Sequence, residues 1–411
     1  MTTRRDTLSG DRSFLALVAT QFLGAFNDNA FKQLVLLLAV DLTQDESGGN
    51  WQALATGLFA LPFVLFSGFA GNLADRFSKT RVIRLAKVAE IAVMVLGAVA
   101  FWCESMPALL VTVFLMGAQS AFFGPAKYGI LPEMLPERHL SRANGVILMT
   151  TFLSIILGMA AAGIVRDLFG DRLWRPQMVY ILLAAMGTWT AFGVRWLPPA
   201  QPGLRIARRP FGDLLSTLRA IAADRDFLCV VVANSYFWFL GAVVQQTINV
   251  YGRNLMGLSN TETSLLLVSL SAGMAGGSLL GGYLSRDRLR LGLTEAGMTI
   301  VVLSLLGLSE AHRHQALAHL GLFTLGLGGG LFGLPLQTCV QIWPAESEKG
   351  RVVAAVNFAN WVLIFASAGY FALAEAFLLT QHITTSLAVL SVVISLLLRK
   401  RLRAAARALA R

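Results

Sequence analysis

The chain has 411 residues, of which 55% are hydrophobic and 14% are charged, and its formal net charge is +11. Soluble domains carry about 25% charged residues, so this composition excludes an ordinary soluble protein and, with a mean hydropathy of +0.64, indicates a membrane protein. The positive charge does not indicate nucleic-acid binding, because the basic residues lie between apolar stretches and gather on one side of the predicted membrane.

Twelve apolar stretches follow one another along the chain. A transmembrane helix needs about 20 apolar residues, whereas a barrel strand needs about 10 that alternate with polar ones. The stretches here are long and do not alternate, so we predict an all-α membrane protein with twelve transmembrane helices. The predicted spans are residues 14–42, 51–74, 82–102, 108–131, 143–165, 177–197, 227–252, 261–284, 291–309, 315–342, 352–376 and 383–398.

Basic residues set the predicted orientation. If the spans alternate in direction, 27 of the 34 Lys and Arg residues fall on the side of the N-terminus and 5 on the opposite side. The positive-inside rule places the richer side in the cytoplasm, so both termini are predicted to be cytoplasmic. The basic tail at residues 399–403 either contacts anionic lipid headgroups or only fixes this orientation.

A segment rich in proline and arginine divides the chain in its middle. Within it, residues 211–221 have the apolar spacing of an amphipathic surface helix. We therefore predict two pseudo-symmetric bundles of six helices each, joined by a cytoplasmic linker that contains a short helix. The N-terminal bundle covers residues 1–197, the linker 198–226, and the C-terminal bundle with its basic tail 227–411.

Two loops, one in each half, resemble each other. Residues 71–81 and 282–290 each have a glycine, then an acid, then several bases. Such related halves are typical of secondary transporters, whose site lies between the repeats near the membrane midplane. We interpret the charges of the first loop as a conformational latch that pairs in one state and separates in another; the alternative is that they only set topology. The predicted latch residues are Asp75, Arg76, Lys79, Arg81 and, beyond the fourth span, Arg142.

The first span has an unusual polar centre. Asn27, Asp28, Asn29 and Lys32 lie in its middle, where a carboxylate costs about 2.5–3.5 kcal/mol on insertion scales. In one interpretation Asp28 and Lys32, spaced i, i+4, form a pair that locks this helix to its neighbours. In the other, Asp28 faces a central cavity and meets an ammonium group or a proton, while the two amides add hydrogen bonds.

Two further lysines are candidates for the same cavity. Lys87 and Glu90 are spaced i, i+3 in the third span, where they form either a structural ion pair or, if they reach the cavity, a site with Lys87 as a phosphate contact. Lys127 follows a Gly-Pro step at the cytoplasmic end of the fourth span. It is either the partner of an acid such as Asp75 or Glu133 or a second phosphate contact.

Polar residues recur on one face of the seventh span and, more briefly, in the eleventh. Such stripes either line a cavity or hydrogen-bond to neighbouring helices, and we favour cavity lining for the seventh span. The stripes are Asn234, Trp238, Gln245, Gln246 and Asn249, and Asn357, Asn360 and Trp361. From them, the predicted substrate-binding residues are Trp238, Gln245, Gln246 and Asn357.

The sequence contains no constellation typical of an enzyme. Its three cysteines are scattered, and it has no phosphate-binding loop that ends in Gly-Lys-Ser/Thr. The glycine clusters at 273–282 and 326–330 lie within apolar spans, where close helix packing explains them better than a nucleotide site. We therefore predict no catalytic residues, no cofactor and no metal.

Several strings resemble known transporter families. GNLADRFSKTR at residues 71–81 resembles the signature loop of the major facilitator superfamily. QFLGAFNDNA at 21–30, GPAKYGILPE at 124–133 and LSRANG at 140–145 together resemble the bacterial lysophospholipid transporter family. SYFWFLGA at 235–242 is similar to the variant of that family that is fused to a glycerophospholipid acyltransferase. Some members have a base in the seventh span where this chain has Gln245 and Gln246.

This resemblance implies a multi-pass protein of the bacterial inner membrane. Its substrate would be lysophosphatidylethanolamine, or lysophosphatidylglycerol, moved from the outer to the inner leaflet by alternating access, with the string around Asp28 in contact with the substrate. The implied partners are membrane lipids and a separate acyltransferase that restores the second chain. Two alternatives stay open: a proton-coupled exporter of amphipathic drugs or small solutes that is protonated on Asp28, and a scaffold that docks an acyltransferase through residues 203–225.

Overall fold

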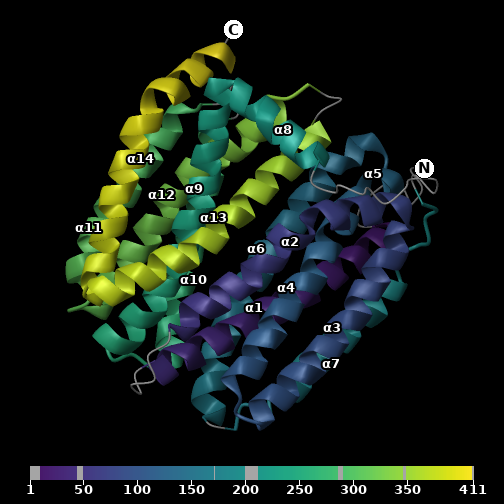
Figure 1. The fold of residues 1–411 in the computed structure, drawn as a ribbon, viewed down its shortest axis with the longest axis horizontal. Helices are drawn as coiled ribbons and strands as arrows, with labels where there is room; N and C mark the ends of the chain where they lie inside the picture. The colour runs from purple at the N-terminus through teal and green to yellow at the C-terminus, as the bar shows by residue number, and fades with distance from the viewer. Residues whose placement is uncertain are drawn as a thin grey trace. The chain divides into compact units, whose positions relative to one another are not determined.

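The computed structural model describes residues 10–43, 50–170, 172–199, 212–285, 290–345 and 349–409. The regular elements in those ranges are helices (Figure 1). In chain order they are α1 (Arg12–Thr43), α2 (Trp51–Arg76), α3 (Lys79–Trp102), α4 (Met106–Gly129), α5 (Leu131–Met134), α6 (Glu137–Phe169), α7 (Gln177–Phe192), α8 (Gly212–Ala223), α9 (Arg225–Val250), the π-helix η3 (Tyr251–Leu255), α10 (Asn260–Leu284), α11 (Gly292–Ala311), α12 (Gln315–Ile342), α13 (Lys349–Phe377) and α14 (Thr380–Leu409).

Each of the twelve predicted spans falls mainly on one helix, and the helices confirm the predicted all-α membrane fold. By length and composition, nine of the helices in the described ranges are able to cross a membrane. The other three predicted spans correspond to α1 and α3, which carry charges in their middle, and to α7, which has 16 residues.

Helix α7 ends at Phe192, whereas the predicted span continues to residue 197. The last carbonyl groups of a helix have no partner inside it. Here the guanidinium of Arg84 on α3 supplies the partners, because it donates to the backbone oxygens of Ala191, Phe192 and Val194. A side chain from α3 therefore stabilises the end of α7.

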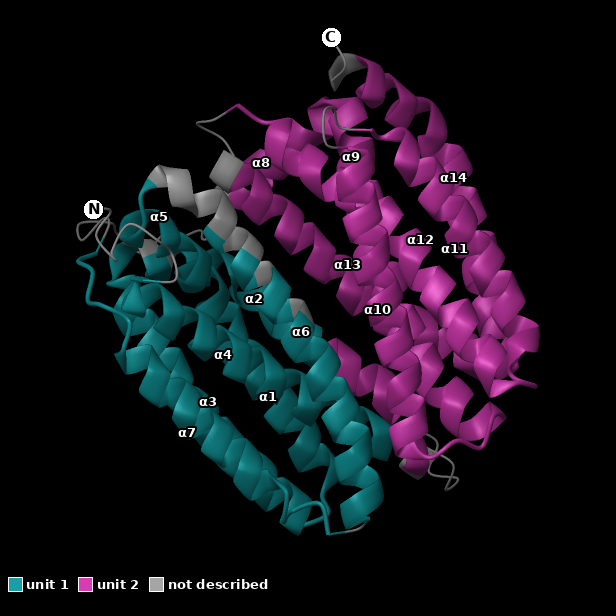
Figure 2. Cartoon of the chain, turned by 180° about the vertical axis from the view of Figure 1, so that it is seen from behind, with its two compact units in different colours: residues 1–39, 58–210 teal, residues 40–57, 211–411 magenta. Residues whose placement is uncertain are grey.

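The helices form two compact units (Figure 2). Unit 1 comprises residues 1–39 and 58–210, and unit 2 comprises residues 40–57 and 211–411. Helices α1 and α2 thus pass from one unit into the other, and the tip of the hairpin that they form belongs to unit 2.

The predicted linker is described in part. Residues 200–211 lie outside the described residues, and α8 follows them. Thr217 and Ile221 of α8 are buried whereas Leu215 is exposed, and the helix packs on α9 and α13. Its buried face is therefore held against unit 2.

The two units repeat one packing scheme. In unit 1, α3 contacts α4 and α7, and in unit 2 the corresponding helix α11 contacts α12 and α14. Helix α6 packs closely on α1, because a Cβ atom at Gly158 would lie 2.7 Å from the carbonyl oxygen of Phe26. In unit 2 the corresponding helix α13 packs on α9. Corresponding helices therefore have corresponding neighbours, as expected for two related halves.

Glycines bring the backbones of α10 and α12 into contact. A Cβ atom at Gly273 would collide with the carbonyl oxygen of Phe323, and one at Gly277 with that of Leu327. Glycines on α12 approach the backbone of α10 in the same way. Small residues allow such close approach of helices in membranes, which supports the packing interpretation of the glycine clusters.

We predict that Gly277→Ala lowers the free energy of unfolding by about 1–3 kcal/mol, the usual cost of overpacking. The added methyl group would meet backbone atoms, which cannot move aside as a flexible side chain can. Gly276→Ala is the matched control, because nothing lies within 4 Å of its Cβ position. Thermal unfolding of the purified protein in detergent should show a lower midpoint for Gly277→Ala only; equal midpoints would contradict the backbone contact.

Candidate functional site

Buried charges from neighbouring helices gather in unit 1. Lys87 and Glu90 of α3 form an ion pair with 2.5 Å between Nζ and Oε2, and their side chains are 2% and 1% exposed. Asn27 of α1 donates to the other carboxylate oxygen of Glu90 at 3.4 Å. A buried pair is tolerated because each charge neutralises the other, but removal of one partner leaves an uncompensated charge. The hydrogen bond from Asn27 thus connects this pair on α3 to α1.

The surroundings of Lys87 are shaped to accept its ammonium group. A Cβ atom at Gly24 of α1 would collide with that group, so the glycine leaves room for it. The ammonium also lies over the ring of Phe123 on α4, 4.6 Å from its centroid, where the aromatic face attracts a cation. The backbone oxygen of Lys87 accepts a hydrogen bond from Thr188 of α7. Three helices besides α3 therefore enclose this residue.

Asp28 contacts α4 rather than Lys32. Its Oδ2 accepts a hydrogen bond of 2.6 Å from Ser120, and its Oδ1 lies 3.4 Å from the amide nitrogen of Gln119. The ion pair proposed from the i, i+4 spacing is not among the contacts of the described residues, and the Lys32 ammonium lies 5.0 Å from the ring centroid of Phe59 instead. Because both donors to Asp28 are neutral, its half-buried carboxylate retains the capacity to bind a cation.

Two amide oxygens in the same cluster have no hydrogen-bond donor. The amide nitrogens of Asn27 and Gln119 point toward acceptors, which fixes the orientation of both amides. This leaves Asn27 Oδ1 and Gln119 Oε1 buried without a partner among the described residues. Such groups cost free energy until a donor satisfies them. Together with Asp28 they form one end of the cluster, which we call the acceptor end because its groups accept hydrogen bonds. It is suited to a group that only donates, such as an ammonium.

Lys127 supplies a positive charge at the other end of the cluster, which we call the cation end. It is buried on α4, and its ammonium lies over the rings of Tyr128 and Phe123, at 4.5 and 5.7 Å from their centroids. No carboxylate in the described part of the chain forms an ion pair with it. Glu133, one of its predicted partners, pairs with Lys79 at 2.6 Å. A buried ammonium whose contacts in the described part of the chain are aromatic faces is suited to receive an anion.

Helix α4 contributes to both ends because of its period. Gln119, Phe123 and Lys127 are spaced four residues apart and share one face, with about 12 Å of helix between the first and the last. Gln119 and Ser120 were not predicted as site residues. The signal that could have identified them is that they are polar residues within a mostly apolar span, eight and seven residues before Lys127. The resulting cluster can bind a molecule that carries a cation and an anion a short distance apart.

Asn29, predicted as a hydrogen-bonding member of the site, makes a local contact. Its amide nitrogen donates to the backbone oxygen of Ala25 in the same helix at 2.7 Å. Side-chain bonds of this kind satisfy a polar group within the membrane without a second helix. The structure therefore brings Asn27 and Asp28 into the charged cluster and shows Asn29 bonded to its own helix.

The polar stripe of α9 is divided between two contacts within unit 2. Near the start of the helix, the amide nitrogen of Asn234 lies 3.2 Å from the side-chain amide of Asn360 on α13. Near its end, Asn249 donates to the side-chain oxygen of Gln52 at 3.0 Å, and Gln52 donates to the backbone oxygen of Gln246 at 2.9 Å. Much of the face that we interpreted as cavity lining thus bonds neighbouring helices.

The remaining predicted residues of unit 2 are more accessible. Trp238 and Asn357 are exposed and Gln245 is partly exposed. With the Asn360 amide turned so that its nitrogen donates to Ser235, its oxygen accepts a hydrogen bond from the Trp238 indole at 3.3 Å. These residues belong to unit 2, whereas the charged cluster belongs to unit 1.

The predicted latch is described in part. Lys79, at the start of α3, is buried and pairs with Glu133 of α5. Arg76 is partly exposed and Arg81 is exposed. The side chains of the other two predicted latch residues, Asp75 and Arg142, lie outside the described residues.

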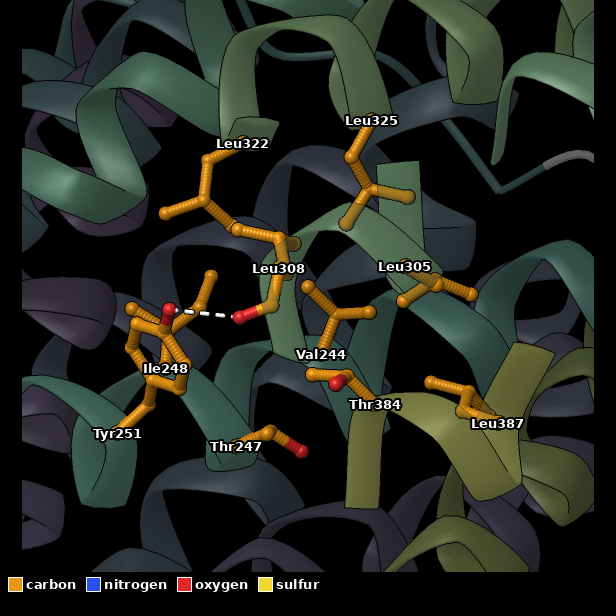
Figure 3. Close-up of a pocket in the computed structure, with 10 residues that line it drawn as sticks. All are labelled: Val244, Thr247, Ile248, Tyr251, Leu305, Leu308, Leu322, Leu325, Thr384 and Leu387. Atoms are coloured by element: carbon orange, nitrogen blue, oxygen red, sulfur yellow. Dashed lines mark hydrogen bonds between the residues drawn. The ribbon is translucent and has the colours of Figure 1, made fainter. Parts of the chain in front are cut away.

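Other kinds of site have less support. The described residues contain no group of three or more His, Cys, Asp or Glu that could hold a metal ion. An apolar pocket in unit 2 is lined by α9, η3, α11, α12 and α14, and the Tyr251 hydroxyl donates to the backbone oxygen of Leu308 beside it (Figure 3). Its volume of about 10 Å³ is close to the minimum for one water molecule, so we interpret it as a packing defect and not as a lipid site.

Known proteins resemble this chain in sequence and in fold. A family model described as Major Facilitator Superfamily matches residues 17–368. The protein named Lysophospholipid transporter LplT from Klebsiella pneumoniae is 28% identical over 371 residues, which cover 88% of this chain and 89% of the relative. The protein of the same name from Yersinia pestis is 26% identical over 360 residues, which cover 86% and 85%.

Solved structures share the fold. A bacterial homolog of the human lysosomal transporter Spinster, in an inward-facing and unoccupied conformation, matches with a TM-score of 0.72 and 14% identity over 97% of this chain and 98% of that chain. A variant of the nucleoside transporter NupG matches with a TM-score of 0.70 and 12% identity over 94% and 99%. At these identities the likeness concerns the fold alone.

We predict that Lys87→Met and Glu90→Gln each lower the free energy of unfolding by about 3–5 kcal/mol, because each leaves one buried charge unpaired. The double change Lys87→Met with Glu90→Gln removes both charges and should cost less than the two single changes together. Thermal unfolding in detergent measures all three. Arg313→Gln is the control, because its pair with Glu310 is exposed and such pairs contribute little. Additive losses in the double variant would contradict a coupled pair.

Proposed function

This chain belongs to the major facilitator superfamily, and on that basis we propose that it transports lysophospholipids across a bacterial inner membrane. The substrates are lysophosphatidylethanolamine and related single-chain lipids, which move from the outer to the inner leaflet by alternating access. Relatives named Lysophospholipid transporter, 26–28% identical over most of the chain, support this substrate class.

The observation that carries the proposal is the two-ended cluster of unit 1. Among the described residues, the oxygens of Asn27 and Gln119 have no donor and Lys127 forms no ion pair with an acid, so Asp28 and the two amides offer acceptors and Lys127 offers a buried cation. A phosphoethanolamine headgroup has an ammonium that only donates and a phosphate that only accepts. The charges match when the ammonium binds at the Asp28 end and the phosphate binds Lys127, and charge-assisted hydrogen bonds are the strong ones.

The direction of the Lys127 side chain agrees with such a headgroup. Its ammonium lies over Phe123, one turn back toward Gln119, as expected from the tilt of side chains toward the N-terminus of a helix. Phe66 of α2 and Phe122 of α4 stack with 5.6 Å between their centroids, and we assign to such partly exposed rings the contact with the acyl chain.

Acylation in the inner leaflet would give the transport its direction. A lysophospholipid that receives a second chain from a separate acyltransferase is no longer a substrate, so the inner pool stays low. The flux then runs downhill, and no coupled ion is needed.

A proton-coupled exporter of amphipathic drugs or small solutes is the second candidate. The observation that favours it is Asp28 itself, because a carboxylate that accepts hydrogen bonds from neutral donors and lacks a basic ion-pair partner among the described residues is also a suitable protonation site. In this function a proton, and not an ethanolamine ammonium, would occupy the acceptor end.

We predict that Asp28→Asn and Asp28→Ala lower the uptake of labelled lysophosphatidylethanolamine into proteoliposomes by at least about tenfold, the effect of about 1.4 kcal/mol, because the ammonium loses its charged acceptor. Uptake of lysophosphatidylglycerol, which has no ammonium, should fall less, whereas Lys127→Gln should reduce both. Glu310→Gln, which removes an exposed carboxylate, is the control. The proposal fails if the wild-type protein moves no lysophospholipid or if both changes at Asp28 leave uptake intact.

The response to a collapsed proton gradient separates the two candidate functions. We expect lysophosphatidylethanolamine uptake into vesicles that contain an acyltransferase to continue after a protonophore is added, because acylation and not the gradient drives it. Loss of uptake within the time of gradient collapse would contradict acylation as the driving force, whereas collapse of drug or solute export is the result that the exporter predicts.

A further inference from the structure

Three arginines lie together on the side of the membrane that otherwise has few bases. Of the 34 Lys and Arg residues, 27 fall on the predicted cytoplasmic side and 5 on the opposite side. Three of those 5, Arg166, Arg172 and Arg175, fall within ten residues around the connection from α6 to α7. The positive-inside rule disfavours bases in a short loop on this side, so topology does not explain their concentration.

Two of these arginines are available to an anion. Arg166 bonds within its own loop, because its Nη1 donates to the backbone oxygen of Gly170 at 2.6 Å. Arg172 and Arg175 are exposed, and neither forms an ion pair with a carboxylate among the described residues. Consecutive turns hold their backbone: the nitrogen of Arg172 donates to the oxygen of Phe169 at 2.9 Å, and that of Arg175 to the oxygen of Arg172 at 3.1 Å.

The loop that carries the two arginines is anchored to unit 1. Leu173 is 3% exposed, and its backbone oxygen accepts a hydrogen bond of 3.0 Å from the side-chain nitrogen of Gln177. Gln177, in the first turn of α7, is itself buried. Because the backbone is packed, the exposed side chains beside Leu173 start from fixed positions, and a ligand that binds them loses little entropy to ordering the loop.

Two tryptophans lie beside the arginines. The rings of Trp102, at the end of α3, and Trp174 stack with 5.8 Å between their centroids and 28° between their planes. The guanidinium of Arg175 lies 5.5 Å from the ring centroid of Trp174, a cation–π contact. Both tryptophans are exposed, at 72% and 42%. Tryptophan is enriched at the level of lipid headgroups, which places the arginines at the same level.

The helix that follows this loop is short for a membrane span. Helix α7 has 16 residues, or about 24 Å at 1.5 Å per residue, whereas the hydrocarbon core is about 30 Å thick. A short span brings its flanking polar side chains and the lipid headgroups together, by snorkelling or by local thinning of the bilayer. Beyond the tryptophans, α3 and α7 lie side by side (Figure 2) and expose the apolar side chains Val99, Met178 and Val179.

We propose that Arg172, Arg175, Trp102 and Trp174 form a binding site for one anionic phospholipid of the outer leaflet, with two acyl chains and a net negative headgroup, as in phosphatidylglycerol. We call it the outer lipid site. The phosphate oxygens accept hydrogen bonds from the two guanidinium groups, for which arginine is well suited. The glycerol region rests on the tryptophan pair, and the acyl chains pack on α3 and α7. The site shares no residue with the charged cluster and does not depend on what the protein transports.

Native mass spectrometry of the purified full-length protein, titrated with phosphatidylglycerol, tests the outer lipid site. The changes Arg172→Gln and Arg175→Gln together should weaken binding of the first lipid at least about tenfold. Arg172→Lys with Arg175→Lys keeps both charges and should weaken it less, because the planar fork alone is lost. Arg313→Gln, which removes another exposed arginine of the same predicted side, is the matched control. Equal affinities of the wild-type protein and the double Gln variant overturn the proposal.

Two further ligands identify what the site recognises. Phosphatidylethanolamine has the same phosphate and chains without net charge, and it should bind at least about threefold more weakly than phosphatidylglycerol. Glycerol phosphate has the phosphate without chains, and it should not bind at the same concentrations, because it cannot contact the tryptophans and the apolar face. Glycerol phosphate that binds as tightly as the lipid would show an anion site only, and equal affinity for the two lipids would remove the anionic preference; either result overturns the proposal.

A change in the charged cluster distinguishes this site from the proposed transport site. Lys127→Gln should leave phosphatidylglycerol binding unchanged, whereas Trp102→Leu with Trp174→Leu should lower it. Thermal unfolding checks that the variants are folded, and the lipid should raise the midpoint of the wild-type protein and of Lys127→Gln more than that of the double Gln variant. Loss of binding in Lys127→Gln alone would place the lipid in the charged cluster and overturn the outer lipid site. A failure of lysophospholipid uptake would overturn only the proposed function.

Discussion

Charges inside a membrane-spanning unit must be neutralised by the protein, because the surrounding hydrocarbon offers no water. Unit 1 meets this requirement in two ways. Lys87 and Glu90 neutralise each other and are enclosed by neighbouring helices. Asp28 and Lys127 have no ionic partner among the described residues and rest on hydroxyl, amide and aromatic groups. The first pair is neutral by itself, whereas in the proposed function a ligand would bring the opposite charges to the second two residues.

The same requirement explains why the cluster is built from α1, α3 and α4. Gly24 leaves space for the Lys87 ammonium, and the ring of Phe123 lies under the ammonium groups of Lys87 and Lys127. The amide nitrogen of Gln119 points toward Asp28. Each contact fixes a side chain in the absence of substrate, so the headgroup would meet groups that are already oriented. Preorganised polar groups lose little entropy on binding, which favours recognition of a small headgroup within a large apolar surface.

The fold could be predicted because its signal is local. An apolar stretch long enough to cross a bilayer is visible in the sequence without any knowledge of its neighbours, and each predicted span is a helix. The end of α7 was less predictable, because the side chain that stabilises it comes from α3. The contacts of Asp41 and Asn50 within unit 2 also depend on distant partners, Arg253 and Glu375, which the local sequence does not reveal.

The candidate site could be predicted only in part, for the same reason. The cost of a buried carboxylate identified Asp28, but helical spacing suggested Lys32 as its partner, and the donors that the structure shows lie on α4. Helical period also placed Asn234 and Asn249 of α9 on one face, yet it could not show that α13 covers one of them and the start of α2 the other. Spacing within a helix fixes which side chains share a face, and tertiary packing decides what that face meets.

The headgroup role of the acceptor end is tested most directly by comparing two lipids of equal charge. Lysophosphatidylethanolamine has an ammonium with N–H donors, whereas lysophosphatidylcholine has a trimethylammonium that cannot donate hydrogen bonds. Equilibrium binding of both to the protein in nanodiscs gives the ratio of their affinities. Because Asn27 and Gln119 each have an amide oxygen with no donor among the described residues, we expect the ethanolamine lipid to bind at least about tenfold more tightly, or about 1.4 kcal/mol. Equal affinities, or a preference for the choline lipid, would contradict this role.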